Sequence, residues 1–299
     1  MNEAPEIVEI DEDSFPNIPL LAAAGVPEDF FEEDRMNAWL EAGEAFQIDD
    51  HPNFAVLNYP SAEGGVAMLL RWHGDAYGLV NAWPFLPTVI SAEIAPLKLA
   101  VDAEGVQAFV TARMGGAVLT FFDDGFIENG PAYRAAEIAY AQFYGIANQA
   151  APAEATEFEI GPDDEEFGQL VAAGHEIAEG GAIRISMAGA AIMVPRFDIA
   201  PNAFEFRGPV VGVEPLPDWI CPDAAVVHVT VLRPFEDEDG TPLEDGFDLP
   251  ILMRPGLIDG EMLPQPGEEM QGIAFLYGTG FEGDPGDDDD DEVPPPLLH

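Results

Sequence analysis

Few side chains in this sequence have the types and spacing that catalysis needs. Cys221 precedes a proline and His228 lies in the apolar run that follows, but no third residue marks a nucleophile and its base. Ser186, in Arg184-Ile-Ser-Met-Ala-Gly189, lacks the first glycine of a nucleophile elbow. We therefore expect a structural cysteine, a histidine within a strand and no catalytic residues.

One glycine pattern matches a cofactor motif. Gly278-Thr-Gly-Phe-Glu-Gly283 has the G-x-G-x-x-G spacing and follows an apolar run. A dinucleotide site also needs a helix that begins at these glycines, so that its N-terminus faces the pyrophosphate. Here Asp-Pro-Gly and five aspartates follow, and they would repel that group. The pattern therefore predicts a glycine-rich strand end and no cofactor.

Metal-binding patterns are incomplete. Glu236-Asp-Glu-Asp239-Gly240 resembles part of a calcium loop, but Phe235 and Gly246 stand where that loop needs ligands. The five histidines show no spacing typical of a metal site. We predict no formed metal site.

Charge is the most informative property of the sequence. The chain has 57 acidic and 10 basic residues, a formal net charge of −47. Residues 1–50 have a net charge of −14, residues 51–150 of −5 and residues 151–299 of −28. A field of this sign repels nucleic acid and anionic membranes and attracts basic protein surfaces. We therefore predict that the protein binds neither nucleic acid nor membranes directly.

The uneven charge favours a dedicated acidic surface. We predict a non-enzymatic acidic binding or inhibitor protein that engages a basic protein surface, such as a nucleic-acid groove whose phosphate charge it imitates. Salt adaptation and an enzyme with an unrecognised site in a β cleft are the alternatives. The candidate partner-binding residues form two acidic runs: Asp163, Asp164, Glu165 and Glu166, and Glu236, Asp237, Glu238 and Asp239.

Composition indicates a folded, soluble chain. Hydrophobic residues make up 47%, which is enough for a sizeable core. The single cysteine rules out an internal disulfide framework. Neither a signal peptide nor a run of 18 apolar residues is visible, so we expect a cytoplasmic protein. The oligomeric state stays open.

Apolar runs separated by Gly, Pro and Asp predict a mostly β protein. Four such runs lie within Phe204–Phe281, and several more within 53–122, where Gly74-Asp75 and Gly115-Gly116 predict hairpin turns. Helical spacing predicts helices over 27–45 and 163–179. The aromatic stripe from Tyr133 to Ala147 favours a third helix, with a buried strand over 137–144 as the alternative.

The predicted fold class is α+β, rich in antiparallel sheet, with a few helices. Residues 1–50 would form an acidic N-terminal extension, irregular up to residue 19, and a helix. An antiparallel β domain with an edge helix would span 51–150. A helix and a small barrel or sandwich would span 151–282, where an OB-like barrel suits the strand count. The acidic, proline-rich residues 283–299 predict a disordered tail.

Overall fold

The computed structural model describes residues 4–11, 15, 17–32, 38–39, 42–48, 51–61, 64–154, 157–164, 167–172, 177–178, 180–216, 220–221, 223–233, 246–260 and 262–283. Within these residues the chain is β-rich with few helices, and it contains a five-stranded barrel and antiparallel sheets. The predicted β-rich class is therefore confirmed.

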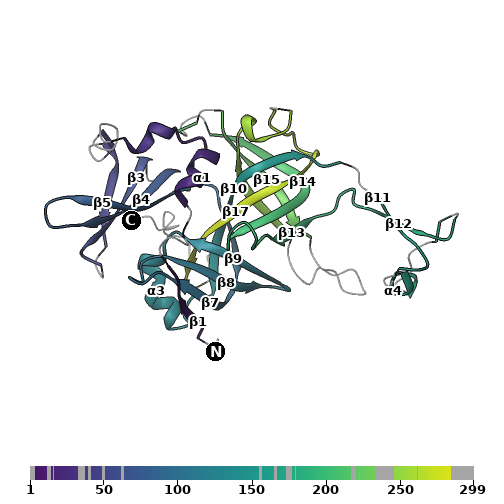
Figure 1. Cartoon of the computed structure of the whole chain (residues 1–299), viewed down its shortest axis with the longest axis horizontal. Coiled ribbons are helices and arrows are strands. Elements are labelled where there is room, and N and C mark those ends of the chain that lie inside the picture. The colour runs from purple at the N-terminus through teal and green to yellow at the C-terminus, as the bar shows by residue number, and fades with distance from the viewer. Residues whose placement is uncertain are drawn as a thin grey trace, which may run out of the picture.

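Five strands close into the barrel at the centre of the molecule (Figure 1). They are β10 (Tyr140–Pro152), β14 (Ala203–Pro215), β15 (Ala225–Leu232), β16 (Phe247–Met253) and β17 (Glu269–Phe281). β17 lies antiparallel between β10 and β14, the strands β14, β15 and β16 form a meander, and β16 pairs in parallel with β10. The four strands predicted within Phe204–Phe281 are thus confirmed, and the fifth precedes them in the chain.

The strand β10 replaces a predicted helix. The helix expected over the stripe Tyr133–Ala147 is wrong: α3 (Phe126–Arg134) ends early, Ala136 has a φ of 59°, and β10 begins at Tyr140. Ala141 and Phe143 pack in one core, whereas the alternate residues Tyr144 and Ile146 pack in another. Because both faces are buried, the strand lacks the polar alternation that would have revealed it. β10 also runs through residue 150, where the sequence analysis placed a domain boundary.

Further strands extend the barrel sheet on both sides. They are β1 (Glu6–Glu9), β6 (Ile90–Glu93), β7 (Ala95–Val101), β8 (Ala108–Met114), β9 (Ala117–Asp123) and β13 (Ile192–Pro195). β9 joins β17 in parallel through Phe122 and Asp123. β8 and β9 meet at the predicted Gly115-Gly116 turn, where Gly115 has a φ of 53°. β1 pairs with β7, so the irregular arm predicted for residues 1–19 is wrong at Glu6–Glu9.

A separate four-stranded sheet packs beside the barrel. It contains β2 (Glu44–Gln47), β3 (Phe54–Ser61), β4 (Gly64–Trp72) and β5 (Tyr77–Phe85), and α1 (Asn17–Ala23) contacts both β5 and β10. A single helix over 27–45, as predicted, does not form: the 3-10 turn η2 (Glu28–Phe31) is followed by extended backbone at Glu32, and β2 begins at Glu44, although residues 38–39 and 42 are helical. The aromatic residues of that segment are nevertheless buried, since Phe30 stacks on Trp39 with ring centroids 3.5 Å apart.

The segment between β10 and β13 projects from the rest of the molecule (Figure 1). β11 (Glu157–Ile160) pairs with β12 (Ile183–Ser186), and α4 (Phe167–Ala172) lies between them in the chain. We call the described residues of 157–186 the acidic arm. Another short 3-10 turn, η3 (Pro255–Leu257), connects β16 to the loop before β17.

Candidate functional site

The acidic arm carries the predicted site residues that the structure describes. Asp163 and Asp164 are exposed after β11, and Asp164 Oδ2 accepts a hydrogen bond of 2.6 Å from the backbone N–H of Gly161. The predicted residues Glu165, Glu166 and Glu236–Asp239 lie outside the described residues. The prediction that both runs bind a partner therefore stays a prediction.

The arm combines carboxylates with exposed apolar side chains. Glu157 and Glu159 are exposed on β11 beside Phe158, whose exposure is 50%; Ile177 is 52% exposed. Arg184 forms a 2.9 Å ion pair with Glu159, but both side chains are 60% exposed, so the pair contributes less than about 1 kcal/mol. A lone two-stranded hairpin is only marginally stable in water. Among the described residues of the arm only Ile183 is buried, and the other apolar side chains are half-buried or exposed.

The possible nucleophiles have structural surroundings. His228 lies within β15, as predicted, and its Nε2 is 3.2 Å from Glu214 Oε1, which leaves Cys221 outside that contact. Cys221 packs against Gly25 instead, where a Cβ would lie 2.6 Å from the cysteine Cβ. Ser186 Oγ accepts a 3.2 Å hydrogen bond from the Ala188 N–H. None of these contacts builds a nucleophile–base pair.

The glycine pattern is explained by packing. Gly278 and Gly280 lie inside β17, which continues to Phe281, as the predicted strand end requires. A Cβ on Gly280 would overlap the Tyr133 hydroxyl, and one on Gly278 would lie 2.5 Å from Gln142 O. Both glycines therefore allow β17 to approach α3 and β10 closely, which is a structural role.

A buried pair of aspartates was missed by the sequence analysis. Asp123 is the last residue of β9 and Asp124 follows it; they are 1% and 7% exposed. Tyr133 Oη donates to Asp123 Oδ2 at 2.5 Å, and Tyr144 Oη lies 2.8 Å from Asp124 Oδ2. Thr279 Oγ1 also donates to Asp124 Oδ1. Two acids directly after an apolar strand were the available signal, but Gly125 made them resemble a turn.

Burial controls the charge of this pair. The pKa of Asp123 is raised to about 7, chiefly by desolvation; the Tyr133 hydrogen bond lowers it, and the neighbouring Asp124 carboxylate adds a smaller increase. Desolvation likewise raises the pKa of Asp124 to about 6. Raised carboxyl pKa values occur at catalytic sites and in structural networks alike. Neither carboxylate lines the apolar cleft beside β9 or the polar cavity on the barrel, so we interpret the pair as part of a structural network.

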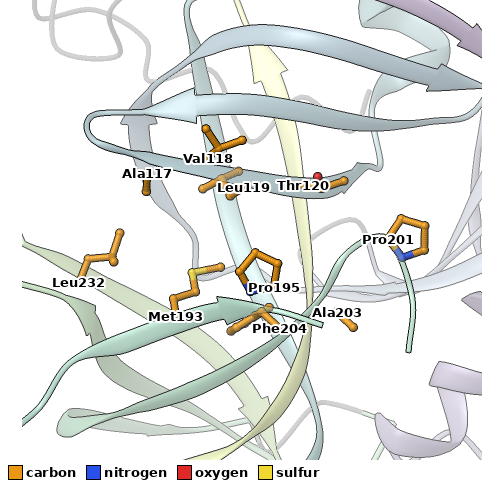
Figure 2. A pocket seen from close by; sticks show the side chains of 10 residues that line it. All are labelled: Ala117, Val118, Leu119, Thr120, Met193, Pro195, Pro201, Ala203, Phe204 and Leu232. Carbon is orange, nitrogen blue, oxygen red and sulfur yellow. The ribbon is translucent and has the colours of Figure 1, made fainter. Parts of the chain in front are cut away.

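An apolar cleft separates β9 from β13 and β14 (Figure 2). Four consecutive residues of β9 line it, from Ala117 to Thr120. Because strand side chains alternate between faces, a consecutive run means that the backbone edge of β9 faces the cleft. Met193, Pro195 and Phe204 lie opposite (Figure 2). The cleft encloses about 30 Å³, room for one or two water molecules, and no ionisable side chain lines it.

A larger polar cavity of about 330 Å³ lies on the outer surface of the barrel, where β10, β14 and β17 meet the residues after η3. Its polar side chains are Gln149, Arg196, Glu205, Asp259 and Gln271. Arginine and carboxylates converge here, but no histidine lines the cavity. This arrangement can bind a polar molecule, and it offers no evident pair of acid and base for catalysis.

Across the described part of the chain, no group of three or more His, Cys, Asp or Glu side chains could hold a metal ion. None of the helices described here is long and apolar enough to cross a membrane. No family model, curated protein or solved structure matches the chain.

Proposed function

We propose that this protein is a non-enzymatic binding protein whose acidic surface engages a basic protein surface. The observation that carries the proposal is the acidic arm. It projects from the barrel and presents the exposed carboxylates of Glu157, Glu159, Asp163 and Asp164 on the same segment as the half-exposed side chains of Phe158 and Ile177. Exposed apolar side chains on a charged segment are typical of protein-binding surfaces.

Electrostatics defines the kind of partner. A net charge of −47 speeds the approach of a basic surface and disfavours acidic ones, although single exposed ion pairs add little affinity. The proposed target is a surface that otherwise binds nucleic acid, with the carboxylates of the arm taking the place of phosphates. We further propose that the barrel is OB-like and that the protein acts in the cytoplasm.

Charge-matched variants test the proposal. The arm variant replaces Glu157 and Glu159 by Gln, and Asp163 and Asp164 by Asn. The control variant makes the same change in net charge at exposed acids elsewhere: Glu6, Glu9, Glu93 and Asp223. Each tagged protein captures partners from a lysate of the source cells at about 50 mM salt, where surface charges are weakly screened.

We expect wild type and control to retain the same basic protein, and the arm variant to lose at least about fivefold of it. Purified partner should then associate more slowly with the arm variant, while dissociation changes less. Equal capture by all three proteins would refute the proposal. Circular dichroism at about 20 mM salt tests salt adaptation: a chain that unfolds there and refolds in molar salt would favour that alternative.

A further inference from the structure

The polar cavity on the barrel has a floor formed by two barrel strands and walls formed by two other segments of the chain. Its floor is the pair β10–β17, with Gln149 opposite Ile273 and Ala151 opposite Gln271. A register shift between Ala147 and Gln149 forms a β-bulge just before the floor. Bulges redirect the side chains that follow them and are common beside binding sites.

Two contacts hold the floor and one wall together. A Cβ on Gly272 would overlap Gln149 O, so only glycine lets β17 lie this close to β10 after the bulge. The backbone N–H of Asp259 donates a 3.0 Å hydrogen bond to Ala150 O, which fixes the residues after η3 against β10. Asp259 and Leu257 therefore form a wall whose position is set by the barrel.

The opposite wall is Arg196 with its carboxylates. Arg196 Nε and Nη2 donate to the two oxygens of Asp198 at 2.9 and 2.8 Å, and Nη1 donates to Glu205 Oε2 at 3.3 Å. The guanidinium charge is thus neutralised within the protein. Arg196 consequently orients Glu205, and its N–H groups are not free to bind an anion through a bidentate pair of hydrogen bonds.

The remaining groups decide the class of ligand. Within the described residues, the side-chain amides of Gln149 and Gln271 have no partner, so each offers two N–H donors and one acceptor. Glu205 and Asp259 add acceptors only. An anion would face both carboxylates. An ammonium ion could donate to the carboxylates and the amide oxygens, but it would leave the amide N–H groups without an acceptor. A hydroxyl group, by contrast, can donate to the carboxylates and accept from the amides.

We propose that this cavity binds a neutral polyhydroxyl compound, a sugar or a polyol. Its volume of about 330 Å³ falls within the range of small-molecule sites, roughly 300–1,000 Å³. Leu257 and Ile273 supply apolar surface for the C–H groups of such a ligand. The site lies on the barrel, apart from the acidic arm, so it does not depend on the proposed function.

Saturation-transfer NMR and calorimetry on the full chain test this site. The neutral probes are glucose and maltose, a single ring and a pair of rings; glucuronate and spermidine are the charged comparisons. Gln149→Ala and Gln271→Ala each remove one amide from the cavity. Gln142→Ala makes the same change on β10, outside the cavity, and is the matched control. Thermal unfolding of each variant confirms that it folds.

We expect at least one neutral probe to bind saturably at millimolar concentration. Each cavity variant should weaken binding about three- to tenfold, the loss of one or two neutral hydrogen bonds, and Gln142→Ala should change it less than twofold. The proposal is overturned if neither sugar binds up to about 50 mM, or if the cavity variants bind as wild type does. Tighter binding of spermidine or glucuronate, lost in the same variants, would overturn the neutral class of ligand.

Discussion

The buried aspartates should make the protein less stable as pH rises. The folded-state pKa of Asp123 is raised from 3.8 to about 7, so between these values the folded chain binds a proton that the unfolded chain releases. The free energy of unfolding therefore falls as pH rises through about 7. Three pKa units correspond to about 4 kcal/mol as an upper value. Asp124, with a pKa of about 6, acts in the same direction.

Urea unfolding at pH 5 and pH 8 measures this effect. About 0.5 M NaCl screens the general repulsion among carboxylates, which would otherwise give the same sign. Asp123→Asn removes the titrating group and keeps an acceptor for the Gly125 N–H, which lies 2.9 Å from Oδ1. Asp163→Asn, at an exposed position, makes the same charge change and is the control.

We expect wild type and Asp163→Asn to lose about 2–4 kcal/mol between pH 5 and pH 8, and Asp123→Asn to lose markedly less. At pH 5 the Asn variant should be the least stable of the three proteins. Its amide nitrogen would take the place of Asp123 Oδ2, which accepts a 3.2 Å hydrogen bond from the Gly280 N–H, and a nitrogen that carries hydrogens cannot accept that bond. At pH 8 that deficit should shrink or reverse. An equally steep loss in all three proteins would show that Asp123 does not titrate in the folded state as argued.

Three further predictions test the packing and the arm. Phe143 is fully buried in the barrel, so Phe143→Ala should lower the free energy of unfolding by about 3–5 kcal/mol. Phe158 is half-exposed, so Phe158→Ala should lower it by less than about 1 kcal/mol. Equal losses in urea unfolding would contradict the assigned core. Gly280→Ala should lower the free energy of unfolding by several kcal/mol, because its Cβ would overlap Tyr133 Oη. Gly116→Ala is the control, since a Cβ there meets no neighbouring atom. A Gly280→Ala variant as stable as the control would refute the close approach of β17 to α3. Limited proteolysis should cut within 157–186 before the barrel strands, because all described residues of the arm except Ile183 are half-buried or exposed; first cleavage within β10 or β17 would contradict this.

The strands were predictable where turn residues bound them. Gly115-Gly116 and the Gly and Pro clusters within Phe204–Phe281 mark strand ends, because these residues adopt backbone shapes that strands do not continue. β10 was not predictable in this way. Its aromatic residues fit both a helical stripe and a strand buried on two faces, and only the tertiary packing on β17 and α1 decides between them.

The candidate sites needed the fold for a similar reason. Asp123 and Asp124 acquire their properties from Tyr133, Tyr144 and Thr279, which lie on three different elements. The polar cavity joins β10, β14 and β17 with the loop after η3, and these are distant in the chain. No motif spans such separations, so their chemistry becomes visible only when the barrel closes.

The fold also bears on the uneven charge. Strands such as β10 and β17 are buried on both faces, and an ionised side chain there would cost several kcal/mol. Acids are accordingly scarce in these two strands, since β10 contains none and β17 only Glu269, its first residue. Part of the charge pattern therefore follows from the architecture alone. The acidic arm is different, because Glu157, Glu159, Asp163 and Asp164 lie on a hairpin that the barrel does not need for its closure. Packing explains neither their charge nor the exposure of Phe158 beside them, and this makes the arm the place where a function for the charge can be tested.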